Sequence, residues 1–317
     1  MNFSIIVPGD CNANCSFCFW EQEQQAPSYM SDLRQVLDTL SSLKDTYTCS
    51  LTGGEPTISP ILHDILTALK ERSNFSKIVL TTNAAGLEDK RYFPGDFAGV
   101  VSHVNISRHA VNDTPNEKVF GCSAVPTGAQ LYEIIEGFNQ KGIDVTINCV
   151  LCNQFSDRQR LLNFITAMRG LGASAVSFRK QHGNLDESEE EMWFKDYKVV
   201  SESSCPVCRA KQQLICGMPV YWKASTLEPS NDLGEVYELV FHPTGKLTAD
   251  WAGNKQVKFA NGKPYIDGTL HKVIKPSIEQ RLDGIEKNIQ ALIKNFESSR
   301  RNQERSHGRA SITRGCG

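Results

Sequence analysis

The first 180 residues alternate between two patterns of apolar and polar positions. Short apolar runs typical of strands cover residues 3–7, 48–52, 78–82, 100–107, 143–151 and 173–178. Between them, apolar residues recur every three or four positions over 33–43, 61–69 and 131–138, a spacing typical of amphipathic helices. Ser156 and Gln159 resemble a capping box at the start of one more helix. Six such units predict an α/β fold with a parallel sheet, open or closed into a barrel.

This alternation stops after Lys180. Residues 186–191 are an acidic run that we interpret as a solvated linker or the start of a helix. Residues 236–251 predict a hairpin that turns at Pro243-Thr244-Gly245. Apolar residues between Ile278 and Phe296 alternate spacings of four and three, which predicts a helix packed on its own domain. The last 20 residues carry five arginines against one glutamate, and we expect a basic, flexible tail.

Composition narrows the function classes. The 317 residues are 40% hydrophobic, enough for one large domain or two modest ones. The net charge of −2 gives no overall electrostatic attraction to nucleic acid or to an anionic membrane. No apolar run reaches the roughly 18 residues of a membrane span. Met1 to Ser4 run straight into a strand-like segment with no cationic stretch before it, so we expect neither a signal nor a transit peptide and a cytoplasmic location.

Cysteine is the unusual feature of the composition. The chain has 11 cysteines, an odd number, and in a reducing compartment these are more often metal ligands or catalytic groups than disulfides. Six of the cysteines form two groups of three, which are Cys11, Cys15 and Cys18, and then Cys205, Cys208 and Cys216. Such grouping predicts two metal sites.

The first group has the spacing C-x₃-C-x₂-C in a loop that follows the first predicted strand. In parallel α/β folds, ligands gather at the carboxyl ends of strands. Three thiolates this close can bind three irons of a [4Fe–4S] cluster and leave the fourth iron open to a substrate or cofactor. A structural zinc site would need four ligands. Phe17, just before Cys18, would shield the cluster from water.

With three further segments, this triplet resembles the radical S-adenosylmethionine (radical SAM) enzymes. It matches their C-x₃-C-x-aromatic-C signature in full. Residues 51–57 contain Gly-Gly-Glu-Pro at the end of the second predicted strand and match the family's GGEP motif. Asn83 ends the third strand, where the family contacts the ribose, and residues 105–108 end the fourth, where a polar residue commonly reaches the methionine part of SAM. The resemblance covers residues 1–182 and implies a partial (β/α)₆ TIM-type barrel with a smaller C-terminal α+β region.

The resemblance implies roles for the GGEP residues. The open iron would chelate the amino and carboxylate groups of SAM. Gly53 and Gly54 have no side chains, so the backbone can approach the ligand closely. Glu55 would pair with the amino group of SAM, and a surface-loop acid is the alternative. Pro56 stiffens the loop and removes a hydrogen-bond donor.

The ends of the third and fourth strands complete the implied SAM pocket. Asn83 can donate to and accept from the ribose hydroxyls, although a turn-forming role is the alternative. Ser107 and Arg108 would contact the methionine part, with a bidentate contact from the guanidinium to the carboxylate. A structural hydrogen bond or an ordinary salt bridge is the alternative for these two residues.

The second cysteine group resembles the auxiliary sites of radical SAM branches that carry a C-terminal iron–sulfur domain, such as the molybdenum-cofactor enzyme and the SPASM-twitch proteins. Cys205, Cys208 and Cys216 have the spacing C-x₂-C-x₇-C. They would hold a second iron–sulfur cluster or a zinc ion, with Cys316, Cys122 or a non-cysteine group as the fourth ligand. The alternative is that these cysteines are packed in a core. The spacing is shorter than in the molybdenum-cofactor enzyme, and its flanking arginine motif is absent, so GTP is not carried over as the substrate.

The resemblance also implies a domain organisation. We expect a radical SAM core at 1–182, a region at 183–275 with the second metal site and the hairpin, a helix at 276–300 and a basic tail at 301–317.

The implied activity is reductive cleavage of SAM to methionine and a 5′-deoxyadenosyl radical, which abstracts hydrogen from a small-molecule or nucleotide-like substrate. An enzyme that modifies a peptide or protein is one alternative, and a non-catalytic iron–sulfur regulatory protein is another. An electron donor such as flavodoxin or ferredoxin would be a partner, whereas a membrane and nucleic acid would not.

Overall fold

The computed structural model describes residues 2–18, 20–43, 45–181, 188–203, 210–224, 235–236, 238–260, 263–266, 269–270 and 272–273. All of them lie in the first of the two units into which the chain divides, Met1–Ile274. The helix expected at 276–300 and the tail expected at 301–317 lie outside the described residues.

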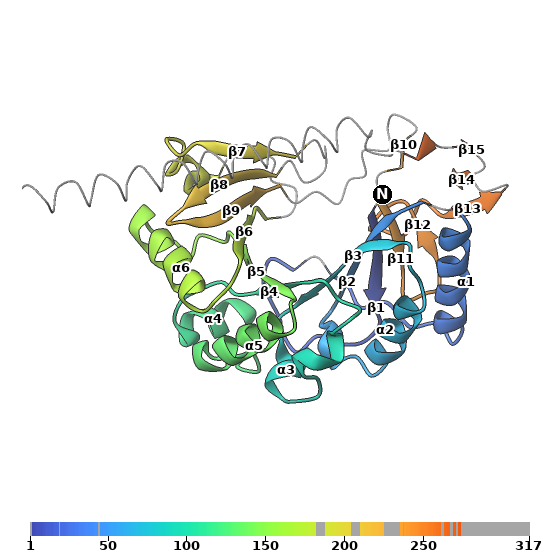
Figure 1. Cartoon of the computed structure of the whole chain (residues 1–317), viewed down its shortest axis with the longest axis horizontal. Helices are drawn as coiled ribbons and strands as arrows, with labels where there is room; N and C mark the ends of the chain where they lie inside the picture. Colours follow the sequence, from blue (N-terminus) through green and yellow to red (C-terminus); the bar gives the residue numbers. More distant parts are fainter. Residues whose placement is uncertain are drawn as a thin grey trace, which may run out of the picture. The chain divides into compact units, whose positions relative to one another are not determined.

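One large sheet organises the described chain. Its strands follow the order β12-β11-β1-β2-β3-β4-β5-β6-β9-β8-β7 (Figure 1). The strands are β1 (Asn2–Val7), β2 (Tyr47–Gly53), β3 (Phe75–Thr82), β4 (His103–Ser107), β5 (Asp144–Val150), β6 (Ala175–Arg179), β7 (Val199–Glu202), β8 (Lys211–Ile215), β9 (Met218–Lys223), β11 (Glu238–Phe241) and β12 (Leu247–Thr248). The stretch from β11 to β9 is parallel throughout, and β12, β8 and β7 are antiparallel additions at the two edges.

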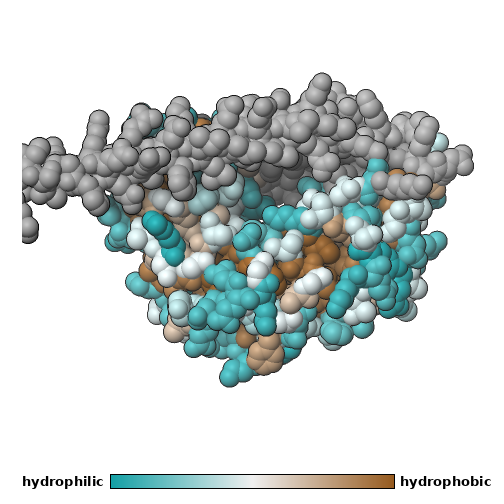
Figure 2. All heavy atoms as spheres, in the orientation of Figure 1, coloured by the Kyte–Doolittle hydropathy of each residue, from teal (hydrophilic) through white to brown (hydrophobic). Residues whose placement is uncertain are grey.

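Helices connect the parallel strands and line one side of the curved sheet (Figure 1). They are α1 (Tyr29–Ser42), α2 (Leu62–Lys70), α3 (Ala85–Glu88), α4 (Asp113–Phe120), α5 (Gly128–Gln140) and α6 (Arg158–Gly170), with the short η1 (Pro56–Ile58) and η2 (Pro94–Phe97). The short α7 (Glu189–Met192) lies between β6 and the antiparallel β7. Figure 2 shows hydrophilic residues along this helical side, with a hydrophobic area between them near the middle. The predicted α/β fold, a partial TIM-type barrel, is confirmed.

Small strands complete the description. They are β10 (Glu235–Val236), β13 (Val257–Ala260), β14 (Lys263–Ile266), β15 (Thr269–Leu270) and β16 (Lys272–Val273). Strands β13, β14 and β15 form an antiparallel sheet, and β10 pairs with β16. No helix in the described segments has both the length and the apolar character that a membrane crossing requires.

Strand alternation separates the hydrophobic core from the polar face of the sheet. On β4, Val104 and Ile106 are buried in the core cluster with the helices, while Asn105 and Ser107 lie on the opposite face. The same alternation places Cys49 of β2 in the core. The face turned away from the helices is therefore where polar side chains can meet a ligand.

Two details differ from the expected elements. The strand expected from residue 100 begins only at His103, because Val100 and Val101 donate to the Phe97 carbonyl in a turn that follows η2. The capping box at Ser156 is wrong by one residue. Asp157 is the N-cap of α6, and its carboxylate accepts from Arg160 N at 2.9 Å.

The hairpin expected at 236–251 is present as β11 and β12, with Gly245 N donating to His242 O at 2.9 Å in the turn. Strand β11 also pairs in parallel with β1, and β9 pairs in parallel with β6. Both edges of the sheet therefore continue into the region we expected to be separate, so the sheet crosses the boundary expected at residue 183.

Candidate functional site

The residues expected to bind a cluster and SAM lie at the carboxyl ends of the parallel strands. The cysteine loop, residues 11–18, follows β1, the GGEP motif ends β2, Asn83 follows β3, and Ser107 ends β4. The carboxyl ends of adjacent parallel strands lie side by side, so these four segments converge. Hydrogen bonds join these segments directly. Glu55 N donates to Asp10 O at 3.2 Å, and Asn83 Nδ2 donates to Asn12 Oδ1 at 2.9 Å.

The three thiols of the cysteine loop lie within electrostatic range of one another. Cys18 N donates to Cys15 O at 3.0 Å, and Ala13 N donates to Cys11 Sγ at 3.4 Å. Burial, followed by the charges of Cys18 and Cys11, raises the pKa of Cys15 to about 12. Burial also raises the pKa of Cys11, and the charges of Glu55 and Cys18 add to this effect. The loop therefore gathers three sulfur donors that favour a nearby positive charge.

This donor set fits three corners of a [4Fe–4S] cluster. Thiols with raised pKa values keep their protons without metal, and a bound cation removes the proton by stabilising the thiolate. Among the residues the structure describes, no three His, Cys, Asp or Glu side chains are arranged around a single metal ion. A cluster does not require that arrangement, because each thiolate binds a different iron. Cys18 is exposed and the other two thiols are half-buried.

Glu55 is buried and binds the ends of β2 and β3 together. Its Oε1 accepts from Thr57 N at 2.9 Å, from Thr57 Oγ1 at 2.6 Å and from the Thr82 hydroxyl. Among the described residues, its Oε2 accepts from Asn83 N alone, at 2.6 Å. Burial raises the pKa of this carboxyl, while the hydrogen bonds from Thr57, Thr82 and Asn83 oppose that rise. Each carboxylate oxygen has two lone pairs, and Oε2 accepts one hydrogen bond from the described residues, so one acceptor position remains on Oε2.

The two glycines allow the cysteine loop and β2 to pack closely. Gly53 has a φ of +148°, and a Cβ there would lie 2.6 Å from Val7 O. A Cβ on Gly54 would lie 2.8 Å from Asp10 O and 2.9 Å from the Trp20 ring. The close neighbours of both glycines therefore belong to this chain, on either side of the cysteine loop. Pro56 is buried at the first position of η1.

Asn83 is buried, and both the oxygen and the nitrogen of its side-chain amide make hydrogen bonds within the chain. Its Oδ1 accepts from Ala85 N at 3.0 Å, in the turn that opens α3, while its Nδ2 donates to Asn12. Asn12 Nδ2 donates in turn to Ala124 O at 2.6 Å. One side chain thus forms the turn that opens α3 and also contacts Asn12 of the cysteine loop.

Arg108 is 2% exposed and is turned into the loop between β4 and α5. Its guanidinium donates to the carbonyl oxygens of Ala110, Pro126 and Val111 at 2.8–2.9 Å, and to Asp113 Oδ1 at 2.6 Å. Four of its five N–H groups are therefore occupied within the chain. The hydrogen bond from Arg108 also holds the pKa of the Asp113 carboxyl below its usual range.

His109 is a residue of this site whose setting the sequence did not reveal. It is buried between Phe17 and Phe120, with ring centroids 5.2 and 4.8 Å away. Its Nδ1 accepts from Val150 N at 3.2 Å, so the neutral ring carries its proton on Nε2. Burial, followed by the charge of Arg108, lowers the pKa of His109 to about 3. The imidazole therefore stays neutral and holds Phe17 of the cysteine loop against β5.

A row of uncharged polar residues crosses the face of the sheet away from the helices. Ser107, Asn148, Ser177 and Tyr221 occupy paired positions on the adjacent strands β4, β5, β6 and β9. Asn148 is 7% exposed and Ser177 is fully buried. Asn148 Oδ1 and Ser177 Oγ have no hydrogen-bond partner within the described part of the chain. Buried polar atoms are rarely left unpaired, so this row can receive the polar groups of a ligand.

The structure describes only one member of the second cysteine group. Cys216 is exposed in the turn between β8 and β9, and its carbonyl accepts from Arg169 Nη1 at 2.5 Å. Because β9 runs parallel to β6, this turn lies at the amino ends of the parallel strands, opposite the cysteine loop. Cys205 and Cys208 lie outside the described residues.

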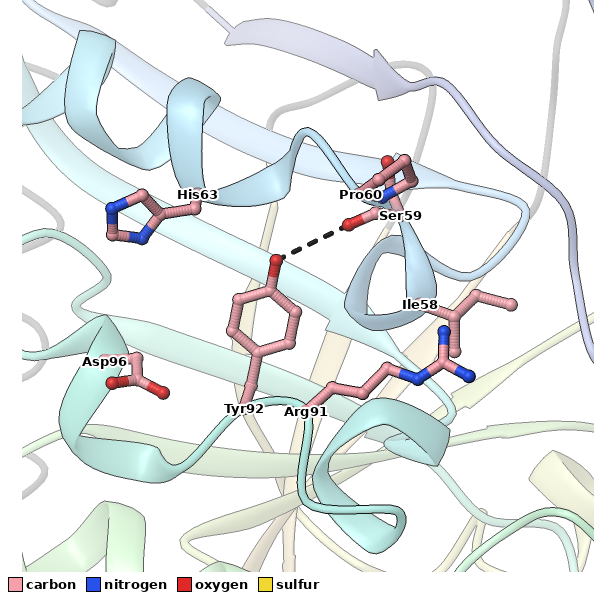
Figure 3. Close-up of a pocket in the computed structure, with 7 residues that line it drawn as sticks. All are labelled: Ile58, Ser59, Pro60, His63, Arg91, Tyr92 and Asp96. Carbon is pink, nitrogen blue, oxygen red and sulfur yellow. Dashed lines mark hydrogen bonds between the residues drawn. The ribbon is translucent and has the colours of Figure 1, made fainter.

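A surface pocket of about 420 Å³ lies beside η1 (Figure 3). It is lined by Ile58, Ser59, Pro60, His63, Arg91, Tyr92 and Asp96, and it contains none of the expected site residues. Tyr92 donates to Ser59 O at 3.4 Å across it (Figure 3). Ser59 Oγ donates to Pro8 O at 2.5 Å, so the pocket wall touches the chain just before the cysteine loop.

Comparison with known proteins gives one family. The family model described as "Radical SAM superfamily" matches residues 5–165. Relatives include a probable GTP 3′,8-cyclase of Saccharolobus islandicus, 29% identical over 203 residues, which are 59% of this chain and 62% of that protein. A GTP 3′,8-cyclase of Aquifex aeolicus is 26% identical over 54% of this chain and 53% of its own length. The chain thus matches roughly three fifths or less of the length of these relatives.

Among solved structures, SuiB of Streptococcus suis bound to S-adenosylmethionine is similar with a TM-score of 0.52. The alignment covers 79% of this chain and 60% of SuiB at 16% identity. This likeness concerns the fold alone, and it agrees with the mostly parallel sheet described above.

Proposed function

The chain belongs to the radical SAM superfamily, and on that basis we propose that it is an enzyme that cleaves SAM at a [4Fe–4S] cluster held by Cys11, Cys15 and Cys18. The observation that supports this most strongly is the convergence of the cysteine loop with the GGEP motif, through the hydrogen bond from Glu55 N to Asp10 O. When bound, the reduced cluster supplies the electron that cleaves SAM to methionine and a 5′-deoxyadenosyl radical, which abstracts hydrogen from a substrate.

The residues around the loop would bind and orient SAM. We assign the open acceptor position of Glu55 Oε2 to the amino group of SAM, because the charge of Glu55 reaches Cys11. Gly53, Gly54 and Pro56 hold the backbone of this loop against the cysteine loop. Asn83 lies at the same edge and would face the ribose.

Ser107 and Arg108 would act differently from each other. Ser107 is half-buried at the end of β4, at one end of the row of uncharged polar residues, so its hydroxyl can reach the methionine part of SAM. Arg108 is committed to the carbonyls of the following loop, and we assign it a positioning role for Ser107 and His109. Its remaining N–H group is the only one left for a direct contact with the SAM carboxylate.

We propose a small-molecule or nucleotide-like substrate on the polar face of the sheet. Asn148 Oδ1 and Ser177 Oγ offer uncharged hydrogen-bonding groups there, and ribose or base hydroxyl and amino groups would satisfy them. The GTP 3′,8-cyclase relatives agree with a nucleotide by name, but the chain matches only part of their length. A peptide or protein substrate is the alternative.

Further parts of the proposal concern the rest of the chain. We propose a radical SAM core at 1–182, a region at 183–275 in which Cys205, Cys208 and Cys216 hold a second cluster or zinc, a helix at 276–300 and a tail at 301–317. An electron donor such as flavodoxin or ferredoxin would reduce the cluster. The described cysteines are all free thiols, which supports a reducing, cytoplasmic location.

The test of this function is SAM cleavage. The protein, reconstituted with iron and sulfide without oxygen and reduced with dithionite or flavodoxin, should release 5′-deoxyadenosine from SAM. The variant with Cys11, Cys15 and Cys18 all changed to Ala should bind about four fewer irons and release none. A triple variant that still cleaves SAM would overturn the assignment, and a wild type with bound cluster but no cleavage would favour a regulatory protein.

Substrate class is tested separately. A nucleotide that is the substrate should raise the rate of 5′-deoxyadenosine release and should be consumed in step with it. If only peptides have this effect, the peptide alternative holds.

A further inference from the structure

A fourth cysteine lies against the cysteine loop. Cys122 follows α4, and Asn12 Nδ2 lies 3.8 Å from its sulfur. The last carbonyl of α4, Phe120 O, accepts from Asn14 N at 2.8 Å and lies 3.9 Å from Cys15 Sγ. The end of α4 thus packs on the cysteine loop, and Cys122 lies where the two segments meet.

Gly121 makes this contact sterically possible. It ends α4 in the left-handed conformation, with a φ of +65°. A Cβ at this position would lie 2.8 Å from Asn14 O, so any other residue would push the helix end away from the loop. Cys122 N donates to Glu117 O at 3.2 Å, which fixes the next residue to the helix. The local fold therefore places the Cys122 thiol beside the loop by several independent contacts.

Cys122 is also close to the thiols of the loop. Asn12, whose Nδ2 lies 3.8 Å from the Cys122 sulfur, stands next to Cys11, and Phe120 O, two residues before Cys122, lies 3.9 Å from Cys15 Sγ. Cys122 is therefore near two of the three expected ligands. Four thiols around one loop equal the number of irons in a cubane cluster, whereas the loop alone supplies three. Cys122 is half-buried, so it is neither in the core nor held by the hydrophobic cluster.

We infer that Cys122 binds the fourth iron of the cluster when SAM is absent and is displaced when SAM binds. This inference rests on the proposed function. On closing, the Cys122 thiol gives its proton to water, and its sulfur replaces a water ligand on the iron. On opening, the amino and carboxylate groups of SAM replace the thiolate, which takes a proton back from water. No electron is transferred in either direction.

Such a ligand would compete with SAM and protect the resting cluster. If the closed form is favoured over the open form by a factor K, the apparent Kd for SAM is raised by 1 + K. A tethered ligand has a high effective concentration, so even a weak bond to iron can produce a closed majority.

The experiment compares Cys122→Ala and Cys122→Ser with the wild type and with Cys152→Ala. Cys152 is another half-buried cysteine, and among the described residues its hydrogen bond is to Gln154 and not to the cysteine loop, so this variant controls for the loss of a thiol. The Ser variant keeps an acceptor for the Asn12 amide and so preserves the contact between helix and loop. Each reconstituted protein is examined by electron paramagnetic resonance in the reduced state, with and without SAM, and its SAM affinity is measured by equilibrium dialysis.

We expect the SAM-free spectrum of both Cys122 variants to differ from that of the wild type and of Cys152→Ala, while all four spectra coincide with SAM bound. We expect SAM affinity to rise at least about threefold in both Cys122 variants, which corresponds to K of about 2 or more. Identical SAM-free spectra and unchanged affinity would overturn the inference. Failure of the proposed function would look different, because the wild type would then bind no four-iron cluster at this loop or would release no 5′-deoxyadenosine.

Discussion

At the scale of single residues, Glu55 shows how one side chain can serve both the fold and the site. Its carboxylate accepts four hydrogen bonds from the ends of β2 and β3, and one acceptor position remains on Oε2. Glu55→Gln places an amide N–H opposite the Asn83 N–H and removes the negative charge. We expect SAM affinity to fall roughly 10- to 150-fold, as is typical for losing a charge-assisted bond of about 1.5–3 kcal/mol.

Thr82→Val is the matched control for Glu55→Gln. It removes one donor to the same carboxylate and leaves the charge in place. This variant should lose about 1.5–3 kcal/mol of stability, because the lost hydrogen bond runs from a hydroxyl to a carboxylate, but it should bind SAM within about threefold of the wild type, because the charge of Glu55 remains. If both variants lose SAM affinity equally, Glu55 acts through the fold alone.

His109 gives a pH dependence whose sign can be worked out. Its pKa is lowered to about 3 in the fold, while an unfolded histidine titrates near about 6.5. Between these values the unfolded chain binds a proton that the folded chain does not, so stability is full above pH ~6.5 and is lost as the pH falls. From pH 7 to pH 5, this residue should lower the free energy of unfolding by about 2 kcal/mol.

The measurement for His109 is oxygen-free urea unfolding at several pH values. In His109→Asn, an amide oxygen replaces Nδ1 as the acceptor for Val150 N, and the loss between pH 7 and pH 5 should shrink by most of that amount. Burial also lowers the pKa of His103, to about 4, so part of the acid sensitivity will remain in the variant. Equal pH dependence in both proteins would show that His109 is not the source.

Contiguous motifs could be predicted at this scale, and scattered partners could not. The cysteine loop and GGEP are short segments whose spacing carries their chemistry. Arg108 is different, because its partners are the backbone carbonyls of Ala110, Val111 and Pro126. Every residue has a backbone carbonyl, so the sequence does not show which of them Arg108 contacts. His109 is set by aromatic rings from two distant segments, which only the fold brings together.

At the scale of elements, the contact between α3 and η1 depends on Gly86. A Cβ at this position would overlap the carbonyl oxygen of Thr57, and Thr57 Oγ1 accepts from Gly86 N at 2.9 Å. Alanine is normally favoured over glycine inside a helix, by about 1 kcal/mol, but here the overlap is with backbone and cannot be relieved by a side-chain rotation. We expect Gly86→Ala to lower the stability by about 1–3 kcal/mol and to weaken SAM binding, since Thr57 supports Glu55.

Gly170→Ala is the matched control, because a Cβ at the end of α6 meets nothing within 4 Å. Its melting temperature should be unchanged or slightly raised. An unchanged melting temperature in Gly86→Ala would mean that α3 and η1 can separate at little cost.

The strands of the core followed from periodicity, whereas the edges of the sheet did not. The runs at 48–52 and 143–151 became β2 and β5 within one residue or so of the expected bounds. Strand β11 pairs with β1, where Asn2 lies opposite Glu238, although the two residues are far apart in the chain. Strand β9 pairs with β6, although the antiparallel strands β7 and β8 lie between them in the sequence. Pairing over such separations is decided by tertiary packing, so local sequence patterns do not contain it.

At the scale of the whole molecule, the cysteine loop and Cys216 lie at opposite ends of the parallel strands. The cysteine loop lies at the carboxyl ends of the parallel strands, and Cys216 lies at the amino ends, beyond β8. Cys208 stands three residues before Lys211, the first residue of β8, and Cys216 follows its last residue, Ile215. A five-residue strand spans about 17 Å, so a single metal site shared by all three cysteines requires the chain before β8 to turn back along the strand.

Iron and zinc content of single variants tests the second site. If Cys205, Cys208 and Cys216 hold an auxiliary [4Fe–4S] cluster, the wild type should bind about eight irons, and each single change to Ala should leave about four. Wild-type iron content in Cys216→Ala, with a loss of iron in Cys205→Ala and Cys208→Ala, would show that the length of β8 keeps Cys216 out of the site. All variants should still release 5′-deoxyadenosine, because Cys11, Cys15 and Cys18 are unchanged. Iron that stays near four in the wild type, with zinc that falls in the variants, would identify a zinc site, and a loss of four irons in Cys216→Ala would show that β8 does not separate the ligands.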